Sequence, residues 1–341
     1  MISSLQARID LLVRLHEFLL DSDSISEELY AKVRAKNPWF TKESVTSAIQ
    51  NIAHFYLDKE KLQSWVSNYS FENNKPKKIG LILAGNIPLV GFHDILSVFI
   101  AGHTAQIKLS DKDSVLTKYL LQQLIDYDSG VAEHFEFVDR LTDYDAIIAT
   151  GSNSSYRIFE QYFSAVPHLL RKNRNAVAII DNDTTPQQLT KLGADILNYF
   201  GLGCRNVSKV YIEKGIDLAR IFEAIENRKE IIHHHKYKNN YDYSYALYLL
   251  NKEEFYTNDF LILRPNAAIS SRISVVHYEY FDSSEKLAQE LENKTEQIQC
   301  LISSKAMGNF DVQEFGQSQQ PSLTDYADGV DTLKFLLDLH K

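Results

Sequence analysis

The sequence predicts an α/β protein built on a doubly wound parallel sheet. Short runs of almost entirely apolar residues alternate along the chain with segments whose apolar residues recur at helical spacing. This alternation indicates βαβ units, and continuous apolar strands are typical of a parallel sheet that is covered on both faces. Because ligands of such sheets bind at the carboxyl ends of the strands, we expect the functional residues to lie there.

The amino-terminal segment, residues 1–70, is predicted to be helical. Pro38 interrupts it, and a second helix is expected to begin at Thr41 and to run towards Tyr56. No residue of this segment belongs to a catalytic motif. The apolar residues of the first helix follow the capping residues Ser3 and Ser4 and are Leu5, Ile9, Leu12, Leu15 and Leu19.

The alternation of strands and helices starts at Lys78. The predicted strands are 79–84, 104–109, 135–138, 144–149, 175–180, 207–212, 273–280 and 298–303. The predicted helices are 93–102, 114–127, 154–163, 184–200, 216–227, one that starts at Ser283 and one at 331–339. The tyrosine-rich tract 237–256 is interpreted as sheet packing, with rings that line an acyl tunnel as the alternative.

Composition and charge argue against several functions. The net charge is −9, and no block of Lys and Arg compensates for it, which argues against nucleic-acid binding. The two cysteines form neither a disulfide framework nor a zinc site and favour a reducing compartment. The start lacks a signal-peptide pattern, and no apolar run reaches the roughly 18 residues that span a bilayer. We therefore expect a cytoplasmic protein without a membrane span.

Cys204 is the candidate nucleophile. It follows the predicted helix 184–200, which starts at Thr184-Thr185-Pro186 and is stopped by Gly201, and it precedes the apolar strand 207–212. Gly203 leaves space beside the thiol for a substrate carbonyl. A cysteine on a tight turn between two rigid elements is typical of a nucleophile that is presented to a substrate. The alternative is a small buried side chain without chemistry.

Asn86 follows the first strand, in the turn Ala84-Gly-Asn-Ile-Pro88. A side-chain amide at the carboxyl end of a strand can donate a hydrogen bond to a ligand. If Asn86 meets Cys204, its Nδ2 and the Cys204 backbone N–H would form an oxyanion hole. The alternative is an asparagine that only tolerates a turn conformation.

Candidate cofactor contacts follow two further strands. Lys108 can reach a ribose or phosphate, with a solvated lysine as the alternative, and Ser110 or Asp111 can bind a hydroxyl group. The turn Thr150-Gly151-Ser152 opens a helix whose N–H groups suit a pyrophosphate. It is not the complete glycine-rich dinucleotide motif.

The histidines and the second cysteine are interpreted as structural. Consecutive histidines at 233–235 do not share a helix face, and no further ligand lies at metal spacing, so no metal site is expected. For His93 and His103, capping or packing is preferred to acid–base chemistry. Cys300 is expected in the core.

Four motifs, in this order along the chain, resemble the LuxC-type acyl-CoA reductase family of the aldehyde dehydrogenase superfamily. They are Ala84-Gly-Asn-Ile-Pro88, Ala101-Gly-His with Ile107-Lys-Leu-Ser110, Ile148-Ala-Thr-Gly-Ser152 and Gly201-Leu-Gly-Cys-Arg-Asn-Val-Ser-Lys209. The resemblance runs from about residue 35 to the carboxyl terminus. By position, Cys204 matches the nucleophile, Asn86 the oxyanion-hole asparagine, Lys108 the adenosine-ribose contact, and Thr150-Gly151-Ser152 the cofactor turn.

The resemblance implies an aldehyde dehydrogenase-like α/β fold. It has a Rossmann-like nucleotide-binding domain at 71–170 and an α/β catalytic domain at 171–315. The helices of 1–70 would pack on the nucleotide-binding domain, and 316–341 would form a carboxyl-terminal segment.

The resemblance also implies the reaction. NADPH would reduce an acyl-CoA or acyl-protein thioester with a long acyl chain to the aldehyde, through a thioester on Cys204, in a homo-oligomer. The water-activating glutamate of the superfamily has no counterpart in the run Arg171-Lys-Asn-Arg-Asn175, which favours acyl reduction over aldehyde oxidation. The alternatives are a non-redox acyl carrier or acyltransferase that uses the same cysteine, and an inactive scaffold of the same fold.

Overall fold

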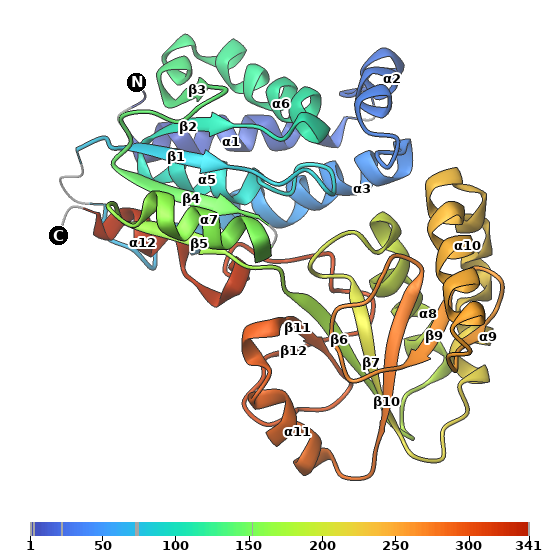
Figure 1. Cartoon of the computed structure of the whole chain (residues 1–341). Coiled ribbons are helices and arrows are strands. Elements are labelled where there is room, and N and C mark those ends of the chain that lie inside the picture. The colour runs from blue at the N-terminus through green and yellow to red at the C-terminus, as the bar shows by residue number, and fades with distance from the viewer. Residues whose placement is uncertain (1, 3, 22, 72–74, 152, 340–341) are drawn as a thin grey trace. The chain divides into compact units, whose positions relative to one another are not determined.

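Two largely parallel sheets, one in each of two structural units, organise the chain (Figure 1). The computed structural model describes residues 2, 4–21, 23–71, 75–151 and 153–339. Unit 1 comprises Met1–Asn173 and Pro321–Lys341, and unit 2 comprises Arg174–Gln320. Each unit has its own sheet and its own hydrophobic core.

The sheet of unit 1 has five parallel strands in the order β3-β2-β1-β4-β5. They are β1 (Lys78–Ile82), β2 (Thr104–Lys108), β3 (Phe135–Phe137), β4 (Ala146–Thr150) and β5 (His168–Arg171). β2 and β3 are added on one side of β1, and β4 and β5 on the other, so the order reverses between β1 and β4. Doubly wound sheets bind ligands at this reversal, outside the carboxyl ends of the strands.

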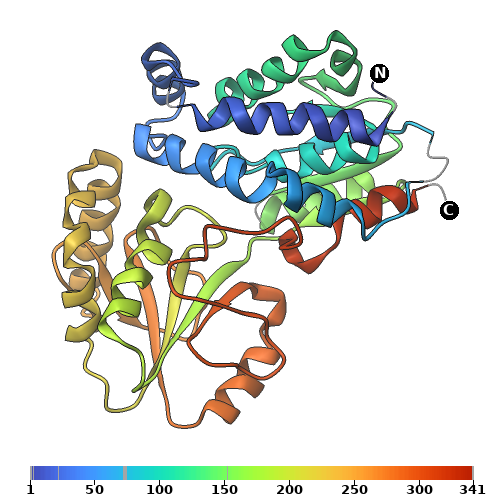
Figure 2. The same cartoon turned by 180° about the vertical axis from the view of Figure 1, so that it is seen from behind.

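Helices cover the sheet of unit 1, and most of them share its main core. Those that follow its strands are α5 (Phe92–Ala101), α6 (Ser114–Tyr127) and α7 (Asn153–Phe163). The terminal ones are α1 (Leu5–Leu20), α2 (Glu27–Lys36), α3 (Lys42–Asn51), α4 (Lys59–Val66) and α12 (Thr332–Asp338). In Figure 2 the blue amino-terminal helices lie across one face of this sheet. Leu12 of α1 and Trp65 of α4 belong to the same buried cluster as Leu81 of β1.

The sheet of unit 2 has the order β12-β11-β6-β7-β10-β9-β8, and only β8 is antiparallel to its neighbour among the described strands. Its strands are β6 (Asn175–Ile180), β7 (Val207–Glu213), β8 (Tyr256–Thr257), β9 (Ile262–Pro265), β10 (Val275–Phe281), β11 (Ile298–Ile302) and β12 (Val312–Gln313). Its α-helices are α8 (Pro186–Leu197), α9 (Ala219–Ile225), α10 (His235–Leu250) and α11 (Ser284–Glu292).

Local capping chemistry sets several boundaries that the sequence predicts. The Ser4 side chain accepts a hydrogen bond from the Ala7 N–H at the start of α1. Thr185 and Gln188 form a reciprocal capping box at the start of α8. Gly102 ends α5 in the left-handed conformation, with φ 79°.

The predicted helix 184–200 is too long. α8 ends at Leu197, and a 3-10 turn over Asn198–Gly201 follows. Tyr199 and Phe200 have φ values of 51° and 60°, which no α-helix can accommodate. The chain therefore turns three residues before the predicted end of the helix.

The interpretation of the tyrosine-rich tract as sheet packing is wrong for most of its length. Residues 235–250 form α10, and its buried side chains recur at helical spacing. They are Tyr237, Tyr241, Ser244 and Tyr248. Packing of this stripe outweighs the preference of tyrosine for strands.

Within the described ranges, no helix combines the length and the apolar character that a bilayer crossing requires.

Candidate functional site

Cys204 lies in a turn that two hydrogen bonds close. The Gly203 carbonyl accepts from the Asn206 N–H at 3.1 Å, and the Gly203 N–H donates to the Asn206 Oδ1 at 2.8 Å. Cys204 and Arg205 are therefore the two central residues of the turn. Cys204 is half-buried, whereas Cys300 is buried in β11 as predicted.

Asn206 organises this turn, a role that no pattern in the sequence predicts. Its side chain is buried and donates from Nδ2 to the carbonyls of Asp195 at 3.0 Å and Asn198 at 2.8 Å. These are carbonyls at the end of α8, where helix geometry leaves the last acceptors without helical partners. The Asn206 carbonyl accepts from the Ala176 N–H of β6 at 3.3 Å. One asparagine therefore links α8, β6 and the cysteine turn.

We expect Asn206→Ala to destabilise unit 2 by about 2–3 kcal/mol, because it leaves buried carbonyls and an N–H group without partners. If Cys204 is the nucleophile that the sequence predicts, acylation of its thiol should slow about 10-fold, because the Asn206 side chain no longer closes the turn. Urea unfolding and single-turnover acylation measure the two effects. Asn239→Ala, at an exposed position of α10, is the matched control. If Asn206→Ala and Asn239→Ala had the same stability and the same acylation rate, Asn206 would not have this role.

The residues before the turn adopt a strained conformation that packing supports. Tyr199 and Phe200 are left-handed, which costs about 1–3 kcal/mol each for non-glycine residues. The Phe200 ring lies 4.3 Å from that of His234. A cavity of about 30 Å³, lined in part by Phe200 and Tyr237, lies beside them.

The candidate cofactor residues of unit 1 lie at the carboxyl ends of β2 and β4, the two strands that flank β1. Lys108 is exposed at the end of β2, and its carbonyl accepts from the Leu83 N–H at 3.2 Å. Thr150 ends β4 and is half-buried. A Cβ on Gly151 would lie 2.8 Å from the Ser155 Cβ, so the turn after β4 packs closely on α7. Ser152 lies outside the described residues.

Asn86 is half-buried in the loop that joins β1 to α5. The residue before it, Gly85, packs against Ser110: a Cβ on Gly85 would lie 2.6 Å from the Ser110 Oγ. The Asn37 Nδ2 donates to the Gly85 carbonyl at 3.4 Å. Ser110 therefore supports this loop, in addition to its predicted role towards a cofactor.

The carboxyl group of Asp113 is buried beside the loop that carries Asn86. Burial raises the pKa of its carboxyl to about 7, and hydrogen bonds from the Leu89 N–H and from Thr117 oppose the rise. Between about pH 4 and pH 7 the folded protein holds this proton while the unfolded chain has released it. Asp113 therefore makes the folded state less stable as the pH rises through this range.

Asp113→Asn is expected to stabilise the protein at pH 8 by up to about 4 kcal/mol, because burial raises the pKa of the Asp113 carboxyl to about 7 and its ionisation in the folded state is costly. At pH 4 the variant and the wild type should differ little, because both side chains are uncharged there. Urea unfolding at the two pH values tests this difference. A destabilised Asp113→Asn at pH 8 would contradict it.

The histidines have structural contacts. The His103 Nδ1 accepts from the Lys77 N–H, and its Nε2 donates to the Leu336 carbonyl. The His93 Nε2 lies 3.0 Å from the Leu323 carbonyl. His234 accepts from the Tyr237 N–H and caps α10. Among the described residues, no cluster of three or more His, Cys, Asp or Glu side chains could hold a metal ion.

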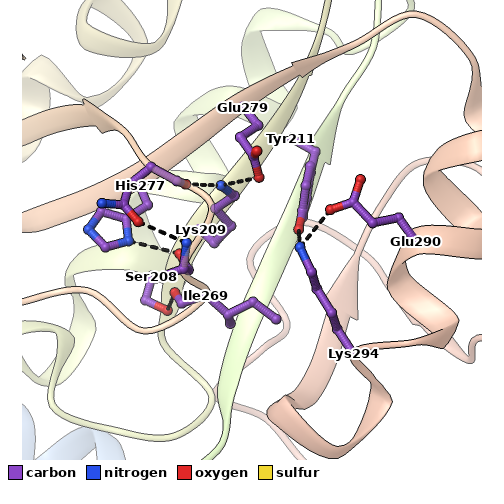
Figure 3. Close-up of polar contacts among 10 residues, drawn as sticks. Ser208, Lys209, Tyr211, Ile269, His277, Glu279, Glu290 and Lys294 are labelled. Atoms are coloured by element: carbon purple, nitrogen blue, oxygen red, sulfur yellow. Dashed lines mark hydrogen bonds and ion pairs between the residues drawn. The ribbon is translucent and has the colours of Figure 1, made fainter. Parts of the chain in front are cut away.

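An ion pair with a buried lysine joins the strand that follows Cys204 to its neighbour (Figure 3). The Lys209 side chain is fully buried on β7, and its Nζ donates to the Glu279 Oε2 of β10 at 2.7 Å and to the Asn266 carbonyl. Burial lowers the pKa of Lys209, and Glu279 opposes this effect. Nearby, Lys294 pairs with Glu290 at 2.6 Å. Lys209 is therefore a link between strands rather than a side chain that substrate can reach.

Known structures share this fold. An indole-3-acetaldehyde dehydrogenase in complex with NAD⁺ is 13% identical over 90% of this chain and 78% of its own, with a TM-score of 0.67. The aldehyde dehydrogenase KauB from Pseudomonas aeruginosa is 13% identical, with coverages of 90% and 78% and a TM-score of 0.65. A mutant of aldehyde dehydrogenase C from Pseudomonas syringae, with NAD⁺ and octanal, is 13% identical, with coverages of 94% and 84% and a TM-score of 0.64. The predicted aldehyde dehydrogenase-like fold is thereby confirmed.

The sequence itself matches one family model. No curated protein matches the chain. The model described as acyl-CoA reductase (LuxC) matches residues 13–232, which is more than half of the chain and includes Asn86, Lys108 and Cys204. The protein is therefore an oxidoreductase of acyl thioesters, and the chain belongs to the acyl-CoA reductase (LuxC) family.

Proposed function

We propose that this protein reduces long-chain acyl-CoA to the aldehyde with NADPH, through a thioester on Cys204. The family supports aldehyde-forming acyl reduction, and the chain length, the donor and the residue roles are our proposal. The observation that carries it is the half-buried Cys204 on a turn closed by Gly203 and Asn206. Such a turn holds a thiol in one position for attack.

In the first half-reaction, the Cys204 thiolate attacks the carbonyl carbon of the acyl-CoA and forms a carbon–sulfur bond. The Asn86 Nδ2 and the Cys204 N–H donate hydrogen bonds to the oxyanion. The intermediate collapses by breaking the bond to the CoA sulfur, and the departing thiolate takes up the proton that Cys204 released. The product is an acyl-enzyme, and CoA leaves as a free thiol.

The cofactor residues that we propose are those of unit 1. Lys108 is exposed at the end of β2, and Thr150 and Gly151 precede the start of α7 at Asn153; anions bind well at the start of a helix. A side chain at Gly151 would clash with Ser155, so a glycine is required at this turn. When bound, NADPH supplies the hydride that brings the acyl group to the aldehyde level. Cys204 then leaves as the thiolate.

The run Arg171-Lys-Asn-Arg-Asn175 has no carboxylate that could activate water. Hydrolysis of the acyl-enzyme would waste the substrate, so this absence favours reduction. We further propose that unit 1 binds the nucleotide, that unit 2 supplies the nucleophile, and that the enzyme works as a homo-oligomer in the cytoplasm. These last points rest on the resemblance to the superfamily.

Intact-mass analysis after incubation with a long-chain acyl-CoA and without NADPH tests the proposal. The wild type and Cys300→Ala should gain one acyl group, and Cys204→Ala should gain none. An adduct on Cys204→Ala would contradict the assignment of the nucleophile. An adduct that never yields aldehyde on addition of NADPH would favour a non-redox acyl carrier or acyltransferase.

A further inference from the structure

The loop that carries Asn86 is held at both ends by buried contacts. It runs from β1 to α5, and Gly85 at its start packs on Ser110. Near its end, the Leu89 N–H donates to the Asp113 Oδ2 at 2.7 Å. Leu89 and Asp113 are 4% and 5% exposed, so water does not compete for this hydrogen bond. Asn86 lies between the two anchors.

Leu89 needs such an anchor because its backbone is strained. Its φ of 57° lies in the left-handed region that bulky residues rarely adopt. Both of its backbone groups are fixed, since its N–H donates to Asp113 and its carbonyl accepts from the Phe92 N–H at 2.9 Å, where α5 begins. Strained residues persist only where the surroundings fix them, and they concentrate at functional sites.

The carboxyl group of Asp113 lowers the stability of the folded protein when it is ionised. Burial of a carboxylate is costly, and an amide of the same shape would accept the Leu89 hydrogen bond without carrying a charge. The raised pKa of Asp113 reflects this cost. What the Leu89 anchor requires is therefore a buried acceptor oxygen at this position, which a carboxyl or an amide can supply.

We propose that Asp113 is a positioning residue for the oxyanion contact: it holds the Leu89 N–H and thereby fixes the loop that presents the Asn86 side chain. This assignment rests on the proposed function, because it assumes that Asn86 binds the oxyanion. Asp113 acts through Leu89 and does not itself touch substrate.

A double-mutant cycle tests the assignment. Single-turnover acylation by a long-chain acyl-CoA is measured without NADPH for the wild type, Asp113→Ala, Asn86→Ala and the double variant. We expect Asn86→Ala to slow acylation about 100-fold, as for loss of one oxyanion donor, and Asp113→Ala to slow it about 10-fold. In the Asn86→Ala background, Asp113→Ala should change the rate less than about 2-fold, because the group it positions is gone.

Two further variants separate positioning from general damage. Asp113→Asn keeps an oxygen acceptor for the Leu89 N–H and should restore the rate to within about 3-fold of the wild type. Asp113→Ser replaces Asp113→Ala in the cycle if the alanine variant does not fold. If the effects of Asp113→Ala and Asn86→Ala on the rate are additive, Asp113 does not position Asn86. The same follows if Asp113→Asn is as slow as Asp113→Ala. Either result overturns the role of Asp113 but leaves the proposed function intact. Absence of any adduct on the wild type would overturn the proposed function, and the assignment with it.

Discussion

Cys204→Ala should lower the rate of aldehyde formation at least about 10³-fold, because no other group takes the place of the attacking sulfur. Aldehyde is measured directly after incubation with acyl-CoA and NADPH. Folding should be unaffected, since Cys204 is half-buried and its turn is closed by the groups of Gly203 and Asn206.

Cys300→Ala is the matched control for this variant. Cys300 is 8% exposed in β11, so its truncation should cost a little stability and leave the turnover number unchanged. Aldehyde formation by Cys204→Ala at a rate near that of the wild type would mean that the acyl group is not carried by this cysteine. Loss of activity in both variants would indicate an indirect effect of cysteine removal.

Glu279→Gln should be the most destabilising of the proposed variants. It leaves the ammonium of Lys209, whose side chain is fully buried, without its anionic partner, and we expect a loss of about 3 kcal/mol in the free energy of unfolding. Adding Lys209→Met to this variant should recover much of the loss, because the double variant buries no unpaired charge. Urea unfolding measures all three proteins.

The chain offers a control pair of similar geometry on the surface. Lys214 and Asp282 lie 2.6 Å apart, but their side chains are 61% and 67% exposed. Asp282→Asn should therefore cost less than about 1 kcal/mol. If Glu279→Gln and Asp282→Asn cost the same, burial of Lys209 does not determine the strength of its ion pair.

The predicted elements that were correct rest on strong local signals. The strand Asn175–Ile180 is apolar almost throughout, and all but its first residue are buried. The capping box of Thr185 and Gln188 marks the start of α8 in the sequence itself. In contrast, β5 (His168–Arg171) was missed, because it is a half-buried strand at the sheet edge and has no apolar run.

Other features depend on contacts that no sequence pattern contains. In the sequence Asn206 is an ordinary turn residue. Its importance comes from its hydrogen bonds to backbone carbonyls at the end of α8. Asp113 bonds to Leu89, 24 residues earlier in the chain, through a left-handed backbone that leucine rarely adopts. The roles of Cys204, Asn86 and Lys108 were predicted from motif order and remain predictions.

The most direct test of the account is a single turnover of isolated acyl-enzyme. The wild type is loaded with a long-chain acyl-CoA, separated from free CoA and mixed with NADPH, and the adduct on Cys204 and the released product are followed together. We predict that the adduct disappears as one equivalent of aldehyde forms. An adduct that persists, or that is released as the carboxylic acid, would contradict the claim that Cys204 carries the acyl group on its way to the aldehyde.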